Sequence, residues 1–284
     1  MREFQKAAAG ARRAARLLAV VPSIPEGLGD HPLPDGALDV RLERVSFAYA
    51  GDTDVLVDLD LHLAPGTRLG LVGRTGSGKS TLGRLVARLW DVTAGTVRLG
   101  GVDIRDVATA DLRHRVAVVS QDVELLRASL RDTLTFLGTV AASDSQLLDA
   151  LRDVGLDRWA AGLAHGLDTV LDDRAGLSAG QAQLLAFARV LLADPGLVVL
   201  DEATSRLDPA TETQLSIAAD RALAGRTVVI IAHRLATVDA VDEVLVLERG
   251  RVLEHGRRTD LVADPASHFA RLLAVSANSR GVLA

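Results

Sequence analysis

The stretch GRTGSGKS, residues 73–80, constrains the fold of this 284-residue chain more than any other feature. It follows the apolar run RLGLV (68–72) and precedes the run TLGRLVARLW (81–90), so we expect a strand, a glycine-rich loop and a helix in that order. Glycines let successive backbone N–H groups turn inward as an anion nest, and the helix N-terminus adds its positive end. The pattern predicts a loop that binds phosphate groups.

The lysine in this stretch supports that prediction. Lysine is rare here, because only Lys6 and Lys79 among the 32 basic residues are not arginine. A compact ammonium on a flexible stem can reach β- and γ-phosphates as a point charge, whereas a guanidinium is a wide planar fork. We expect the Ser80 hydroxyl to bind Mg²⁺. The alternative is a glycine-rich turn that merely shares the spacing; the flanking strand and helix favour the phosphate loop.

Two carboxylates follow a second apolar run, in GLVVLDEATS. A turn at 194–196 leads into a buried strand at 197–200, and Asp201 and Glu202 stand where that strand ends. Ligands of open α/β sheets bind at the carboxyl ends of strands. Asp201 is therefore expected to hold Mg²⁺ through its waters, and Glu202 to orient or deprotonate the attacking water in phosphoryl transfer. The alternative is an acidic start to the next helix.

Two more strand-like runs end in polar residues suited to the same chemistry: VAVVS leads into Gln121, and TVVIIA leads into His233. From about Asp39 onward such runs alternate with helical stretches, which predicts a parallel sheet covered by helices. The four strand ends would then meet at one edge. A lone histidine after a strand is more often structural, and this convergence favours the catalytic interpretation.

A second helix start, in GLSAGQAQLLAFARVLLADP, resembles an anion site. Ser178 is expected to be the N-cap of a helix from about 181 to 192, which leaves the N–H groups of Ala179, Gly180 and Gln181 exposed for an anion. The alternative is simply a well-capped helix.

Composition limits the class of protein. The chain has no cysteine, so a reducing compartment is the default, and its net charge of −5 gives no global sign of nucleic-acid binding. No run reaches the roughly 18 to 20 apolar residues of a membrane span, and no signal peptide is evident, so we expect a soluble chain. Four of the eight prolines fall between Pro22 and Pro34, which predicts a linker rather than a packed element.

The order of these motifs, from about Asp39 to Leu273, resembles the nucleotide-binding domain of an ABC (ATP-binding cassette) transporter, most closely that of an exporter. GRTGSGKS is similar to Walker A, LVVLDE to Walker B and LSAGQ to the signature. Gln121 is similar to the Q-loop glutamine, SRLD (205–208) to the D-loop and His233 to the switch histidine. Tyr49 in VSFAY stands where the family has an aromatic that stacks on adenine; the alternative is a strand-edge aromatic.

The resemblance implies a complete set of site residues. Catalytic roles fall to Lys79, Gln121, Glu202 and His233, and Mg²⁺ ligation to Ser80, Gln121 and Asp201. ATP would be bound by Tyr49, Gly73, Arg74, Thr75, Gly76, Ser77, Gly78, Lys79, Ser80, Thr81, Gln121 and Asp201, and the partner's ATP by Ser178, Gly180, Gln181 and Asp208. Two such domains would close head to tail around two ATP molecules.

The resemblance also implies an α/β architecture. We expect a P-loop NTPase core, with a mostly parallel sheet flanked by helices and an antiparallel β portion, plus an α-helical subdomain at about 126–194. The nucleotide-binding domain would span 39–273, preceded by a basic helical tail (1–21) and a linker (22–38) and followed by a C-terminal tail (274–284). The tail at 1–21 resembles the end of an exporter's last membrane helix, so we expect an excised part of a longer polypeptide; a membrane-surface helix and a disordered tail are alternatives.

The expected partners are a membrane-spanning domain, which would dock near 122–133, and a second nucleotide-binding domain, at the cytoplasmic face of the inner membrane, with no nucleic acid. The signature departs from the family's LSGGQ pattern, because Ala179 replaces a glycine, and Ala182 and Leu184 stand where arginine is common. This suggests the catalytic half of a heterodimer; a homodimer that tolerates the alanine is the alternative. Other candidate functions are an importer ATPase, a soluble ABC ATPase acting on nucleic acid or ribosomes, and a non-hydrolytic nucleotide sensor.

Overall fold

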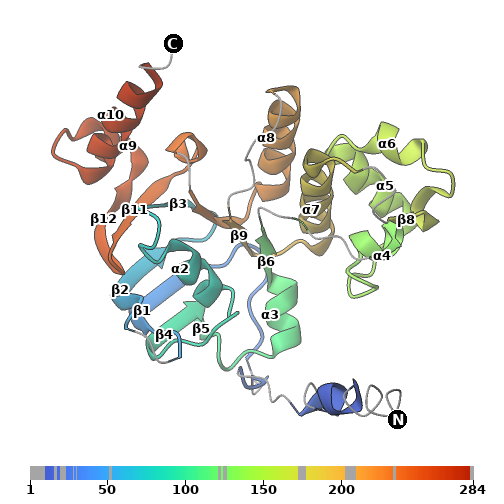
Figure 1. Ribbon diagram of the computed structural model, residues 1–284, viewed down its shortest axis with the longest axis horizontal. Coiled ribbons are helices and arrows are strands. Elements are labelled where there is room, and N and C mark those ends of the chain that lie inside the picture. Colours follow the sequence, from blue (N-terminus) through green and yellow to red (C-terminus); the bar gives the residue numbers. More distant parts are fainter. Residues whose placement is uncertain are drawn as a thin grey trace, which may run out of the picture.

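A computed structural model describes residues 10–15, 18–19, 24–27, 29, 31–50, 53–120, 123, 127–171, 177–201, 209–232 and 235–281. Two sheets form the body of the molecule, and helices of the 130–193 region stand to one side of them (Figure 1). The helical residues 10–15, in blue, and the C-terminal helix, in red, lie at opposite ends of this view.

The larger sheet has six strands in the order β12-β11-β3-β10-β9-β6. Their bounds are Arg251–Arg257, Glu243–Glu248, Arg68–Val72, Thr227–Ile231, Leu197–Asp201 and Val116–Val119. The five strands from β11 to β6 pair in parallel, and only β12 is antiparallel to its neighbour. The predicted parallel sheet is confirmed.

The smaller sheet is antiparallel, with the order β2-β1-β4-β5. Its strands are Leu56–Leu63, Val40–Phe47, Ala94–Leu99 and Val102–Asp103. Val40 and Leu42 face the core, and after an irregularity around Arg44 (φ 47°) so do Val45 and Phe47, while residues between them face solvent. This is the antiparallel portion that the resemblance implies.

Helices pack on the large sheet and beyond it. They are α2 (Lys79–Val86), α3 (Thr109–Arg115), α8 (Pro209–Leu223), α9 (Arg258–Ala263), α10 (His268–Gly281) and the 3-10 turn η2 (Leu235–Val238). The segment between β6 and β9 holds α4 (Leu130–Leu134), α5 (Asp144–Asp153), α6 (Asp157–Ala161), η1 (Gly166–Asp168), α7 (Ala179–Ala193) and the short pair β7 (Ala128–Ser129) and β8 (Val170–Leu171). In the described part of the chain, no helix combines the length and apolar character needed to cross a membrane.

Helix α2 ends earlier than the sequence indicates. The run 81–90 is expected to be helical, but the helix stops at Val86 because Arg88 adopts a left-handed conformation (φ 48°). The N–H of Leu89 bonds the carbonyl of Arg84, and the N–H of Arg88 bonds that of Leu85, which is the Schellman pattern of a helix end. Glycine is usual at this position, and a larger residue costs about 1 to 2 kcal/mol there.

The described residues between 24 and 38, which we call the strap, lie against the domain. Leu33 and Leu38 are buried in the core, Gly29 donates its N–H to the carbonyl of Asp106, and Arg115 bonds the carbonyl of Pro34. The expectation that this proline-rich range is not a packed element is therefore wrong for these residues. Their packing depends on side chains about 80 positions away, which local composition does not reveal.

Candidate functional site

The four predicted strand ends meet at one edge of the large sheet. Asp201 at the end of β9 pairs with Ile231 of β10, whose neighbour on the other side is Leu71 of β3, and Val119 of β6 pairs with Leu200. The glycine-rich loop, Asp201 and the residues that follow β6 and β10 therefore leave the sheet side by side. Gln121, Glu202, Asp208 and His233 lie outside the described residues.

The glycines of the loop take conformations that other residues avoid. Gly78 has φ 104°, and a β-carbon there would lie 2.4 Å from Leu56 Cδ2. Gly73 has φ 154°, and a β-carbon there would lie 2.3 Å from the carbonyl oxygen of Leu247. Only glycine fits these two positions, and backbone of positive φ is what an anion nest is built from.

Lys79 closes the loop on itself. Its side chain is buried, with 5% of the residue exposed, and Nζ donates hydrogen bonds to the carbonyl of Gly73 at 2.6 Å and to that of Arg74 at 3.2 Å. In the same loop Ser77 Oγ is buried with no hydrogen-bond partner among the described residues. A held ammonium and an unsatisfied hydroxyl suit a ligand that brings negative oxygen atoms.

The first turn of α2 has no side-chain cap. Its N-cap is Gly78, so no side chain caps the helix, and no acidic residue stands in the first turn. The first amides of the helix, which have no partner within the helix, and its positive dipole end therefore face the loop, which is the arrangement that binds phosphate.

The predicted metal ligands fit a sparsely coordinated ion. Ser80 is the second residue of α2 and Asp201 ends β9, and both are half-buried. Among the described residues, no group of three or more His, Asp or Glu side chains could hold a metal ion by itself. A hydroxyl and a carboxylate at the phosphate loop suit Mg²⁺, which takes few protein ligands and keeps waters and substrate oxygens.

Tyr49 is held over the start of α2. Its hydroxyl lies 3.1 Å from Thr81 Oγ1 and accepts a bond of 3.4 Å from Arg84. Its ring meets Phe47 and Trp90 edge to face, with centroids 4.8 and 5.4 Å apart. Sequence reasoning missed Trp90; the available signal was only that it is one of two tryptophans in the chain.

The helix start at LSAGQ is satisfied within the chain. Ser178 Oγ accepts the N–H of Gln181 at 3.2 Å, and the Gln181 side chain accepts the N–H of Ser178 at 2.9 Å, a complete capping box. The predicted N-cap is confirmed. The expectation that the Gln181 N–H is exposed for an anion is wrong, because the serine hydroxyl already accepts it.

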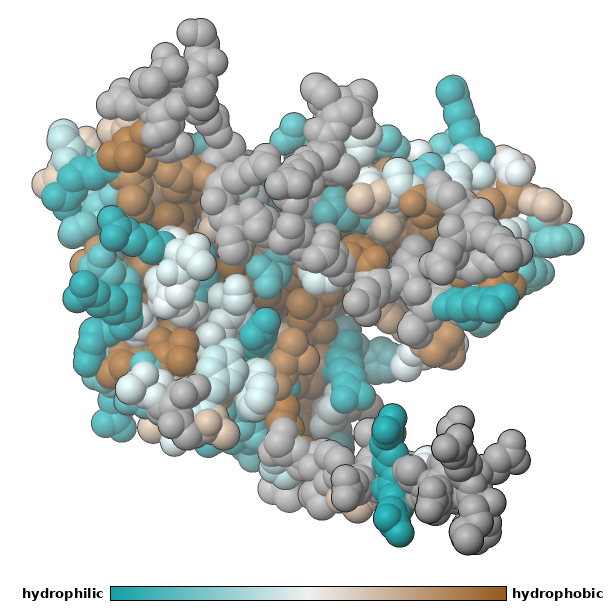
Figure 2. All heavy atoms as spheres, viewed as in Figure 1, coloured by the Kyte–Doolittle hydropathy of each residue, from teal (hydrophilic) through white to brown (hydrophobic). Residues whose placement is uncertain are grey.

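Two cavities lie near the site, one beside α7 and one beside the glycine-rich loop. A groove of about 520 Å³ runs between β6 and α7, lined by apolar residues that include Val118 and Phe136, and by Arg189. Arg189 lies over the Phe136 ring at 5.1 Å and donates to the carbonyl of Thr133, and burial lowers its pKa. A second cavity of about 360 Å³ lies between the glycine-rich loop and α10, where Figure 2 shows apolar surface.

A phosphate-binding loop that opens a helix at the carboxyl edge of a parallel sheet defines the P-loop NTPase fold. Comparison with known proteins gives the family. The family model "ABC transporter" matches residues 56–205, and the chain belongs to that family.

Similar proteins agree with this. The chain is 37% identical over 274 residues to an "ATP-dependent lipid A-core flippase" from Pseudomonas fluorescens, covering 96% of this chain and 45% of that protein. It is 41% identical over 238 residues to "Mycobactin import ATP-binding/permease protein IrtA" from Mycolicibacterium smegmatis, covering 84% and 27%. In the solved "Structure of a bacterial Atm1-family ABC exporter with ATP bound" the similarity has a TM-score of 0.76 at 33% identity, covering 91% and 44%.

The chain spans less than half the length of each of these proteins. It is an ATP-binding domain of the exporter type, from a family of ATPases, as the motif order indicates.

Proposed function

We propose that the chain binds Mg-ATP in the loop at 73–80, hydrolyses it and, as one of two domains closed head to tail, drives export across a membrane. The observation that carries the proposal is the joining of the loop and Asp201 at one edge of the parallel sheet, with Lys79 held inside the loop. The names of the similar proteins support transport, and one of them is an import protein, so the direction rests on the likeness to exporters.

Each residue has a proposed task. The amides of 73–81 and the Lys79 ammonium bind the phosphates, and Tyr49, braced by Trp90, stacks on the base. Glu202 orients and deprotonates the attacking water, while Gln121 and His233 help to position water and phosphate. Ser80, Gln121 and Asp201 hold Mg²⁺, which when bound neutralises phosphate charge that develops in the reaction.

The second domain would complete the site. Ser178, Gly180, Gln181 and Asp208 are proposed to contact the partner's ATP. For the amide of Gln181 to do so, the capping bond with Ser178 has to be shared or exchanged. Ala179 adds a methyl group where the family has glycine, which favours a heterodimer in which this chain carries the intact catalytic residues.

The membrane-spanning domain is the proposed partner of the groove at β6 and α7. The apolar lining, with Phe136 half exposed, and the position of the groove beside the expected docking stretch 122–133 support this assignment. The similar proteins that are more than twice the chain's length support a fused membrane domain. The location would then be the cytoplasmic face of the inner membrane.

Phosphate release by the wild-type chain, compared with Glu202→Gln, tests hydrolysis. The wild type should release phosphate from Mg-ATP. The variant should bind ATP as tightly, and its rate of phosphate release should be lower by about 100-fold or more. Equal release by both proteins would remove Glu202 from the mechanism, and no release by either would leave a nucleotide sensor.

The solution mass of Glu202→Gln with Mg-ATP, measured by light scattering, tests the dimer. A monomer that dimerises only when Ala179→Gly is added supports a heterodimer, because the native signature then awaits a different partner. An ATP-dependent dimer of the unmodified signature supports a homodimer and ends the heterodimer hypothesis.

A further inference from the structure

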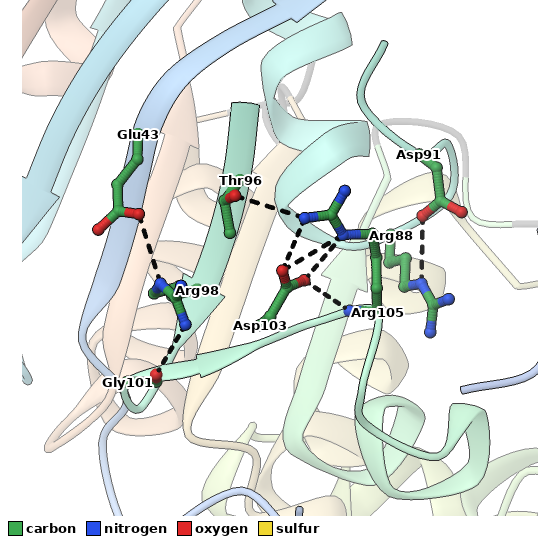
Figure 3. Close-up of polar contacts among 8 residues, drawn as sticks. All are labelled: Glu43, Arg88, Asp91, Thr96, Arg98, Gly101, Asp103 and Arg105. Atoms are coloured by element: carbon green, nitrogen blue, oxygen red, sulfur yellow. Dashed lines mark hydrogen bonds and ion pairs between the residues drawn. The ribbon is translucent and has the colours of Figure 1, made fainter. Parts of the chain in front are cut away.

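Three segments that are far apart in the sequence meet at the C-terminal end of α2. The Arg88 guanidinium donates to the carbonyl of Pro25 at 3.0 Å and to that of Val107 at 3.4 Å. Its Nε pairs with Asp91 at 3.2 Å, the contact drawn in Figure 3. The Arg88 side chain is 2% exposed. One buried side chain thus joins the strap, the end of α2 and the loop that precedes α3.

The loop that carries Val107 is braced. Asp103 accepts the N–H of Arg105 at 3.0 Å and pairs with its guanidinium at 2.7 Å, and the same guanidinium reaches Thr96 of β4 (Figure 3). The carbonyl that Arg88 grips therefore belongs to a fixed turn rather than to a loose loop.

The strap is attached to the same turn at three more points. Glu26 accepts the N–H of Thr109, at the start of α3, at 2.9 Å. Gly29 donates its N–H to the carbonyl of Asp106 at 3.1 Å. Gly27 lies so close that a β-carbon there would stand 1.9 Å from the carbonyl oxygen of Val107. A side chain at position 27 cannot be accommodated while the strap is docked.

The backbone of Arg88 is strained, which suggests that its side chain has a role. Arg88 occupies a left-handed helix end where glycine would be unstrained. A strained residue that a fold retains is a reason to look for a function. Here the three contacts of the Arg88 guanidinium offset the backbone strain.

Helix α2 connects this joint to the phosphate loop. Arg88 follows its last turn, and Lys79 begins its first. Between them Gly83 lies against the large sheet so closely that a β-carbon would stand 2.7 Å from Ile231 Cδ1 and 3.2 Å from Val199 Cγ1. A short, closely packed helix moves as one body, so a shift at one end is felt at the other.

We propose that Arg88 is a positioning residue that ties the strap to α2, so that docking of the strap sets the affinity of the phosphate loop for nucleotide. The proposal rests on the proposed function only in taking the loop as the ATP site. A movement of the segment before the strap would then change the affinity for ATP through the docked residues of the strap, Arg88 and α2.

Three variants of the full chain test the proposal. Gly27→Ala expels the strap by a clash, and Arg88→Gly removes the clamp while it relieves the strained helix end. Gly10→Ala, with nothing within 4 Å of the added carbon, is the matched control. Titration calorimetry with ATP and with ADP gives the dissociation constant and the number of sites, and hydrogen exchange at the Gly29 and Thr109 amides reports docking.

The expected result is a dissociation constant raised about fivefold or more, for ATP and ADP alike, in Gly27→Ala and in Arg88→Gly. Exchange at both amides should be faster, and the control should match the wild type. The double variant should be no weaker than the worse single one, because both changes break the same link. Arg88→Lys should recover part of the affinity.

Other outcomes overturn the proposal. Faster exchange with an unchanged dissociation constant would mean that the strap docks without acting on the loop. Fewer sites per chain at an unchanged dissociation constant would reflect a misfolded fraction and hence a merely structural arginine. Additive losses in the double variant would place the two residues on separate routes. A wild type that binds no nucleotide would instead refute the proposed function.

Discussion

The starts of α2 and α7 face the same physical problem and solve it differently. Each helix leaves its first amides without intrahelical partners. At α7, Ser178 and Gln181 close the capping box within the chain, whereas at α2 the N-cap is a glycine with no side chain to offer. The comparison teaches that α2 offers its first amides with no side-chain cap in the way, whereas α7 has to share or exchange a capping bond before its Gln181 amide can meet a ligand.

A third start, that of α3, lies between these two. Its N-cap Ala108 supplies no side-chain bond, and the Thr109 amide is accepted by Glu26 from the strap, 83 positions away. The start of α2 thus has no side-chain cap, that of α3 is bonded by another segment, and that of α7 is closed by its own capping box. Four changes would break or sharpen this comparison.

The largest effect is expected from Lys79→Ala. The variant removes the only charged group held inside the described part of the loop at α2, so turnover should fall by roughly 10² to 10³. Phosphate release measured at saturating ATP checks this. Lys79→Arg should be nearly as inactive, since the buried position does not admit a planar fork, and a fully active arginine variant would contradict the role given to the ammonium.

Next comes a pair of glycine variants in the same loop. Gly78→Ala combines left-handed strain with a clash against Leu56 and should cost about 3 kcal/mol of unfolding free energy. Gly76→Ala, with φ 80° and nothing within 4 Å of the added carbon, should cost about 1 kcal/mol from strain alone. Urea denaturation measures both. Equal losses would show that the contact with Leu56 does not constrain the loop.

Ser178→Ala tests the self-capped helix. Loss of the N-cap should lower the unfolding free energy by about 1 kcal/mol, with no change in ATP affinity for the monomeric chain. Ser178→Asp, which keeps an acceptor, should restore most of the stability. A variant as stable as the wild type would mean that the hydroxyl contributes nothing at this helix start.

The smallest effect concerns pH at the start of α3. The Thr109 amide, which donates to the Glu26 carboxylate, lowers the pKa of Glu26 below its usual 4.5, with help from the charges of Arg113 and Arg88. A lowered folded-state pKa stabilises the docked carboxylate above pH 4.5 and loses that contribution as the pH falls through the folded pKa. The Thr109 amide resonance should shift in that acid window in the wild type and not in Glu26→Gln.

Local patterns in the sequence account for the core of the site. Three kinds of feature were predictable because each has its own apolar pattern or boundary residues. They are the strand at 68–72, the strands ending near Asp201 and Ile231, and the N-cap at Ser178. The early end of α2, the packed strap and the occupied Gln181 amide were not predicted. The first two depend on a guanidinium that reaches segments 19 and 63 positions away, which no local window contains.

The large sheet separates two apolar cores. Val199 and Val229 face the core shared with the antiparallel sheet, while their neighbours Val198 and Val228 face the core shared with the helices. Because alternate residues serve opposite cores, the insertion or deletion of one residue within a strand would exchange every later side chain between them. During evolution such strands can exchange one apolar residue for another, but they cannot gain or lose a residue. Differences in length between this chain and its relatives are therefore expected in the turns that join the strands.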